Sequence, residues 1–204
     1  MKKKVLSLVC ALSTFLSIGM SASAESISAD STVALKETVQ VGEYQCYVEN
    51  GQYYTVLDGE TYLVINLDEA MPCSSNDGVS VASVQTDQEI DINGSSYNGQ
   101  IDISNGDFAT PIFCGDENGL PRGYQISTGF IFENVYQVTP RVFNTAYNAW
   151  VNQNTVTIAF GLFQQTKILY TGTTATVCSK AQFIFHKDGS TGEPVFNYTI
   201  SEII

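Results

Sequence analysis

The feature that most constrains this chain is a two-residue alternation of apolar and polar side chains, broken by dipeptides that favour tight turns. Two such dipeptides, Asn50-Gly51 and Asp58-Gly59, stand between three β-rich runs. Both dipeptides accept the positive φ angles that two-residue hairpin turns require. The sequence therefore predicts a three-stranded meander over residues 44–67.

The same period continues through the second half of the chain. Val156, Ile158 and Phe160 alternate with Thr157 and Ala159, which is the pattern of a strand with one buried face. Further strands are predicted at 79–84, 130–138, 155–163, 167–171, 175–185 and 195–201. Only residues 142–152 are compatible with a short helix. The fold class is therefore all-β, and we expect an antiparallel β-sandwich of jelly-roll type with at most one short helix, with a barrel as the alternative.

Residues 89–103 predict a further hairpin with one apolar and one acidic face. Isoleucines alternate there with acids on either side of two Asn-Gly dipeptides: Ile90, Ile92, Ile101 and Ile103 with Glu89, Asp91 and Asp102, around Asn93-Gly94 and Asn98-Gly99.

The N-terminal residues have the three parts of an export signal. Three lysines precede an apolar stretch over 5–18, and Ala22-Ser23-Ala24 supplies a cleavage site. We expect residues 1–24 to be removed, 25–36 to form a flexible leader, and 37–204 to form one β domain that is secreted to the extracellular space. Because no later segment reaches the roughly 20 apolar residues of a membrane span, no membrane insertion is expected.

The charge balance is strongly acidic. The chain carries 21 acidic and nine basic residues, a formal net charge of −12, and the loss of the three lysines in the signal would lower it to −15. Between Glu37 and Pro121 there is no Lys or Arg. Nucleic acid, which requires a basic face, is therefore not an expected partner. A solvated acidic face is the simpler interpretation, and an acidic surface that docks on a basic partner is the alternative.

Four cysteines remain beyond the signal: Cys46, Cys73, Cys114 and Cys178. An even number in an exported chain predicts two disulfides, whose three possible connectivities stay open. With a single histidine and no Cys-x-x-Cys pair, the sequence gives no indication of a zinc site.

One acidic segment has a spacing reminiscent of a calcium loop. It comprises Asp87, Glu89, Asp91, Asn93 and Gly94, but a calcium loop in this register would end on Gln100 rather than on a bidentate glutamate. Acids on the solvated face of a hairpin explain the same pattern. We therefore expect no cofactor, with calcium as the alternative.

Paired carboxylates are the only candidate catalytic groups with a plausible spacing. Residues two apart on a strand share a face at about 7 Å, so Glu89 with Asp91, or Asp58 with Glu60, would suit glycoside hydrolysis. His186 has no Gly-x-Ser-x-Gly partner and is predicted to be a surface residue at a strand end. No catalytic residue is assigned.

Aromatic residues give the best functional indication. Tyr97, Tyr124, Tyr147 and Trp150 lie near predicted turns or beside asparagines, where rings would stack on a sugar while amides bind its hydroxyls. We expect a non-catalytic extracellular binding module for polysaccharide or a surface protein. The alternatives are a small secreted glycan hydrolase, and a structural or inhibitory protein that docks on a basic partner.

Overall fold

The computed structural model describes residues 37–69, 71–72, 83–84, 88–115, 118–161 and 165–203. The predicted signal peptide (1–24) and leader (25–36) lie outside the described residues, as do Cys73 and Asp87. The described chain is dominated by strands, and its helical content is limited to two 3-10 turns, η1 (Leu67–Glu69) and η2 (Ala175–Val177).

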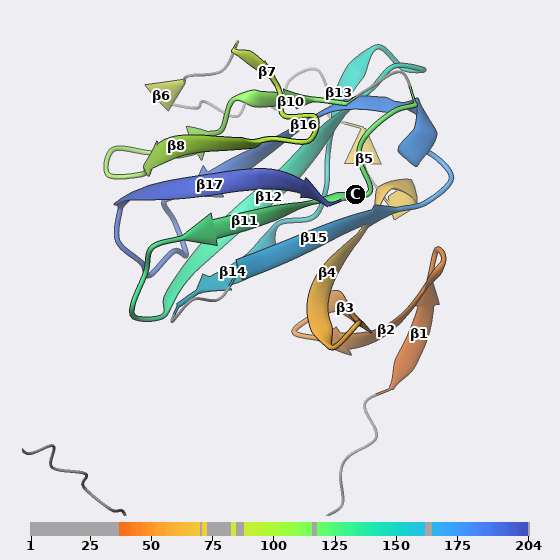
Figure 1. Cartoon of the computed structure of the whole chain (residues 1–204), viewed down its shortest axis with the longest axis horizontal. Helices are drawn as coiled ribbons and strands as arrows, with labels where there is room; N and C mark the ends of the chain where they lie inside the picture. The colour runs from red at the N-terminus through yellow and green to blue at the C-terminus, as the bar shows by residue number, and fades with distance from the viewer. Residues whose placement is uncertain are drawn as a thin grey trace, which may run out of the picture. The chain divides into compact units, whose positions relative to one another are not determined.

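The first sheet, called sheet A, has eight strands in the described part of the chain (Figure 1). Their order across the sheet is β1-β2-β3-β4-β15-β11-β17-β8. Their bounds are β1 Thr38–Val41, β2 Tyr44–Glu49, β3 Gln52–Leu57, β4 Glu60–Asn66, β8 Ser96–Asp102, β11 Gly123–Thr128, β15 Gln165–Thr171 and β17 Val195–Ile203. The predicted meander is β2-β3-β4, and Asn50, Gly51, Asp58 and Gly59 all have positive φ, as two-residue hairpin turns require.

The second sheet, sheet B, is built around the long strand β12 (Asn134–Asn144), which pairs with β16 (Cys178–His186). On its other side β12 pairs with β13 and β14. The remaining bounds are β5 Met71–Pro72, β6 Ser83–Val84, β7 Glu89–Asp91, β9 Phe108–Ala109, β10 Ile112–Cys114, β13 Ala149–Asn152 and β14 Val156–Phe160.

The two separate sheets confirm the predicted all-β sandwich rather than a single closed sheet. Most strand pairs are antiparallel, as expected. Among the described strands three pairs are parallel, β4 with β15, β7 with β10 and β6 with β9, so the sheets are mixed and depart from a strictly antiparallel jelly roll.

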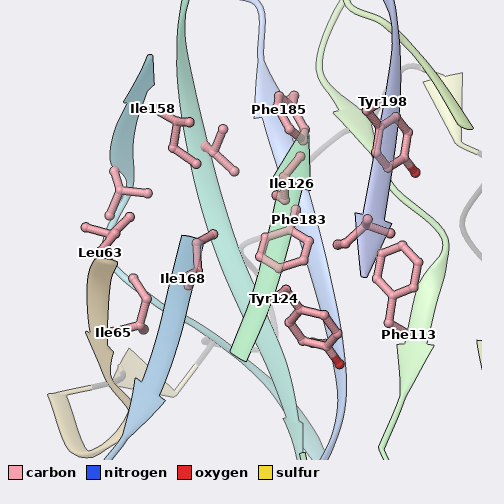
Figure 2. Packing of buried hydrophobic residues seen from close by; sticks show 14 of the residues in the cluster. Leu63, Ile65, Phe113, Tyr124, Ile126, Ile158, Ile168, Phe183, Phe185 and Tyr198 are labelled. Atoms are coloured by element: carbon pink, nitrogen blue, oxygen red, sulfur yellow. The ribbon is translucent and has the colours of Figure 1, made fainter. Parts of the chain in front are cut away.

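The main core lies between the two sheets and is rich in aromatic rings (Figure 2). Phe113, Tyr124 and Phe183 are fully buried there, with ring centroids 5.7–6.4 Å apart. The predicted alternation on β14 is confirmed, because Val156, Ile158 and Phe160 are buried while Thr157 and Ala159 are exposed. Apolar side chains at every second position thus give each strand its inward face.

A second, smaller cluster is separate from the main core. It contains Val41, Tyr44, Cys46, Val64 and Leu169, from β1, β2, β4 and β15. Ile168 belongs to the main core and its neighbour Leu169 to the second cluster. Because consecutive strand residues point to opposite faces, sheet A is apolar on both faces at this point.

The predicted hairpin over 89–103 does not form. β7 pairs with β10 in sheet B, whereas β8 pairs with β17 in sheet A. Asn98-Gly99 lies within β8 rather than in a turn. Ile92, Ile101 and Ile103 are buried as expected, but they enter the core from a segment that passes from one sheet to the other.

The possible helix over 142–152 is a hairpin in the structure. The end of β12 turns at residues 145–148 and returns as β13, with Phe143 opposite Trp150. Asn148 has φ of 49°, and the side chain of Asn144 accepts hydrogen bonds from the N–H groups of Ala146 (2.9 Å) and Tyr147 (3.3 Å). The Asn144 side chain and the positive φ of Asn148 thus stabilise a turn at these residues rather than a helix.

The prediction of two disulfides is wrong. Cys46, Cys114 and Cys178 are free thiols, whereas any two bridges among four cysteines would join at least one pair of these three. Cys46 lies in the second cluster, Cys178 lies in the main core, and the Cys114 sulfur lies 3.7 Å from a carboxylate oxygen of Glu89. The packing therefore holds the three sulfurs in different surroundings.

Candidate functional site

Two of the four predicted ligand-binding aromatics belong to the core. Tyr124 is fully buried, so its ring lies in the core and not at the surface, where a ligand platform was expected. Tyr97 is half-buried on β8 and packs against Phe113 and Tyr198, with ring centroids 5.9 and 6.1 Å away. Hydrophobic packing accounts for the position of both rings.

The other two aromatics, Tyr147 and Trp150, lie on the β12–β13 hairpin but on different sides of it. Tyr147 is 71% exposed and borders a hollow that Val142 and Val151 also line. Trp150 packs on the opposite side against Phe143, with the guanidinium of Arg141 4.5 Å from its ring centroid. The cation covers one face of the indole, so the two rings do not form a single flat platform.

A groove that sequence reasoning missed lies between the β3–β4 hairpin and strands β14 and β15. Its volume is about 480 Å³, and its lining includes Tyr54, Thr61, Leu63, Thr157, Gln165 and Thr166. We call it the Tyr54 groove. Tyr54 and Leu63 face each other in the β3–β4 register, while Leu63 and Ile158 supply the apolar floor from the main core.

Tyr54 provides the aromatic wall of this groove. Its ring stacks on Tyr47 with centroids 5.6 Å apart and planes inclined by 22°, and it packs against the main core. Burial raises the pKa of the Tyr54 hydroxyl, so the group stays a neutral donor and acceptor over the physiological range. An apolar ring face beside hydroxyl and amide groups matches the two-sided character of a sugar ring.

The Tyr54 groove borders the edge of strand β14. The side chain of Gln52 pairs with both backbone groups of Thr157: Gln52 Nε2 donates to the carbonyl (3.3 Å), and the Thr157 N–H donates to Gln52 Oε1 (3.2 Å). Backbone groups on a strand alternate between its two edges, so those of Ala159, two residues on, point to the same side as those of Thr157. The Gln52 amide thus joins the two walls at this edge.

The rim of the groove carries a paired charge. Lys167 forms an ion pair with Glu60, to which the hydroxyl of Tyr62 also donates a hydrogen bond (3.1 Å), and the ammonium lies 5.4 Å from the Tyr62 ring centroid. The hydrogen bond from Lys167 holds the pKa of Glu60 below its usual value. The rim is therefore polar, with its carboxylate already neutralised by a partner.

Glu89 and Asp91, one of the two candidate carboxylate pairs, also have partners. Glu89 forms an ion pair with Lys180, which lowers the Glu89 pKa, and Asp91 accepts a hydrogen bond from the N–H of Asn93 (2.9 Å). A glycosidase acid requires a raised pKa, and the shifts of Glu60 and Glu89 run the other way. Within the described ranges, no group of three or more His, Cys, Asp or Glu side chains is arranged to hold a metal ion.

His186 is held on both sides instead of lying free at a strand end. Its Nδ1 lies 2.8 Å from Asp107 Oδ2, and its Nε2 lies 2.8 Å from Thr139 Oγ1, which is 2.6 Å from Thr155 Oγ1. The order of groups resembles that of a hydrolytic triad. However, Thr139 is only 7% exposed, and its hydroxyl is also within hydrogen-bond distance of Thr155. These hydrogen bonds therefore connect β12, β16 and the segment before β9.

Among the residues that the structure describes, no helix is long and apolar enough to cross a membrane. Compared with protein-family models, curated proteins and solved structures, the chain gave no match.

Proposed function

We propose that this protein is a secreted, non-catalytic binding module that holds a polysaccharide segment in the Tyr54 groove. The observation that carries the proposal is a groove of about 480 Å³ with an aromatic wall, an apolar floor and polar side chains around them. This volume falls within the roughly 300–1,000 Å³ of small-ligand sites. The signal-like N-terminus supports an extracellular ligand.

The chemistry of the groove favours binding over hydrolysis. Hydrolysis of a glycosidic bond needs one carboxylic acid that stays protonated near neutral pH and a second carboxylate across the bond. Glu60, the carboxylate in the lining of the groove, has a lowered pKa and an ammonium partner. Binding of a sugar by stacking on Tyr54, with hydrogen bonds from Gln165, Thr61 and Thr166, requires neither a protonated carboxylic acid nor a second carboxylate.

The test is retention of the purified protein on insoluble cell-wall and plant polysaccharides, with released reducing sugar read from the same tubes. Tyr54→Leu removes the ring and keeps an apolar side chain, and we expect it to weaken retention at least about tenfold, or 1.4 kcal/mol. Tyr147→Leu is the matched control, because it removes an exposed tyrosine from the hairpin that sequence reasoning favoured.

Each outcome has a definite meaning. Loss of retention in Tyr54→Leu alone supports the Tyr54 groove. Loss in Tyr147→Leu alone moves the site to the β12–β13 hairpin and rejects the groove. Release of sugar by the unaltered protein, abolished in Glu60→Gln, would replace the binding module with a hydrolase.

A further inference from the structure

A second surface, away from the lining of the Tyr54 groove, exposes bulky apolar side chains. Residues 129–133 form a bend between β11 and β12, in which Ile131 is 69% and Phe132 is 79% exposed. Phe132 is the most exposed large hydrophobic residue that the structure describes. Burying apolar side chains removes their surface from water, so adjacent exposed apolar side chains with polar neighbours mark a surface that another molecule covers.

The base of this bend is fixed by buried polar contacts. Asn134 is buried, and its Nδ2 donates to the carbonyl of Phe132 (2.9 Å) while its Oδ1 accepts from the N–H of Glu193 (2.9 Å). The hydroxyl of Tyr136 donates to the carbonyl of Glu193 (2.9 Å). The side chain of Asn134 thus connects the bend to the segment before β17.

Close packing restricts the bend further. Phe130 turns inward against Phe196, with ring centroids 5.1 Å apart. A Cβ added to Gly161 would come within 2.8 Å of the Glu133 Cα. Ile131 and Phe132 are therefore presented on a held backbone, and a preorganised apolar anchor loses little entropy when it binds.

The charges around the bend are acidic. Glu133, at the end of the bend, and Glu193, in the segment before β17, are both exposed. An adjoining hollow of about 430 Å³ is lined by Ile131, Phe132, Glu193 and Val195 among others, with no Lys or Arg. The whole chain carries a formal charge of −12. Both the local and the net charge disfavour a second copy of this chain and an anionic membrane as the covering surface.

We propose that the bend at residues 129–133 is a docking surface for another protein, one that presents an apolar surface bordered by lysine or arginine. Phe132 and Ile131 enter the apolar part, and Glu133 and Glu193 face the basic border. Two side chains in an apolar pocket supply the affinity, while the carboxylates favour the correct partner and speed its approach.

The probe for the test is a synthetic amphipathic peptide of leucine and lysine, which presents an apolar face bordered by ammonium groups. Binding to the purified protein is measured by fluorescence anisotropy of the labelled peptide at low and at physiological salt. We expect the double variant Ile131→Ser, Phe132→Ser to bind at least about tenfold more weakly. Val56→Ser, which removes an apolar side chain that is 55% exposed on β3, should leave the Kd within about twofold.

The carboxylates are tested separately. Glu133→Gln with Glu193→Gln should weaken binding and make it less sensitive to salt, because fewer screened charge pairs remain. A leucine and glutamate peptide with the same apolar face should not bind.

Three results would overturn the proposal. They are equal affinity in the serine double variant, binding to phosphatidylcholine vesicles that the double variant abolishes, or concentration-dependent dimers that the double variant abolishes. A normal unfolding midpoint of each variant shows that the fold is intact. Because the Tyr54 groove is untouched, retention on polysaccharide separates failure of this proposal from failure of the first.

Discussion

The main core and the second cluster stabilise the chain in different ways, and neighbouring residues of one strand show the contrast. Ile168 points into the main core among large rings from both sheets, whereas Leu169 points into the small cluster of Val41, Tyr44 and others. The main core joins both sheets. The second cluster packs β1 and β2 against β4 and β15 within sheet A alone, so it is the part expected to open first.

Polar contacts make up for the small size of the second cluster. Arg122 Nε donates to the Tyr44 hydroxyl (2.9 Å), and Thr171 donates to a carboxylate oxygen of Glu43. Gly42, between β1 and β2, approaches Thr171 so closely that a Cβ there would overlap its hydroxyl oxygen. Burial of apolar surface stabilises the main core. The second cluster depends more on hydrogen bonds and on the close contact of Gly42 with Thr171. Four predictions test this contrast.

Loss of a main-core ring should have the largest effect. Phe183→Ala removes a buried ring that packs on both Phe113 and Tyr124, and it should lower the free energy of unfolding by about 3–5 kcal/mol. Urea unfolding followed by tyrosine fluorescence measures it. Phe132→Ala removes a ring of the same size from the surface and should change stability by less than about 0.5 kcal/mol. Equal losses in the two variants would contradict the assignment of the core.

A side chain at Gly42 should have the next largest effect. Gly42 has φ of 56°, and an added Cβ would lie 1.8 Å from Thr171 Oγ1, so Gly42→Ala should lose about 2 kcal/mol or more in the same urea assay. Gly59→Ala is the matched control. It has φ of 81° but no atom within 4 Å of the added Cβ, and should lose about 1 kcal/mol from backbone strain alone.

Thiol labelling should compare the two clusters directly. Burial raises the pKa of both Cys46 and Cys178, that of Cys178 to about 11, so each reacts only when its surroundings open. Under native conditions we expect Cys46 to be labelled at least about tenfold faster than Cys178, a difference of about 1.4 kcal/mol in opening. Mass spectrometry of a variant with Cys73→Ser and Cys114→Ser measures both rates. Identical rates would mean that both clusters open together.

Loss of the Arg122 hydrogen bond should have the smallest effect. Arg122→Leu keeps an apolar stem but leaves the buried Tyr44 hydroxyl without this donor, and should lower stability by about 1 kcal/mol. Because the change touches only the second cluster, labelling of Cys46 should accelerate while that of Cys178 stays constant. Acceleration at both cysteines would show that Arg122 supports the whole fold.

Local patterns in the sequence predicted the local elements well. Asn50-Gly51 and Asp58-Gly59 require positive φ and form their turns, and the alternation on β14 identifies its buried face. These local patterns could not predict which strands, far apart in the sequence, pair with each other. Gly99 looked like part of a turn, yet it lies in β8 opposite Tyr198 of β17, whose ring passes within 2.6 Å of where its Cβ would be.

The candidate site could be predicted only in fragments. Tyr54 and Glu60 lie close together in the sequence, and Glu60 was considered for its spacing from Asp58. Thr157 and Lys167 complete the Tyr54 groove from more than 90 residues away. The parallel pairing of β4 with β15 brings Lys167 there, whereas Thr157 comes from β14 of sheet B and meets the side chain of Gln52. A sequence pattern cannot show which strands become neighbours, so Tyr147 and Trp150, whose surroundings are local, drew the prediction instead.

The pairing of Gln52 with Thr157 also bears on how the protein behaves in a crowded solution. An uncovered strand edge is a template on which other chains add strands and aggregate. The Gln52 amide presents one donor and one acceptor to β14, as a neighbouring strand would, and so occupies the place where such growth would begin. A single side chain thereby protects the edge beside the groove while leaving the groove open.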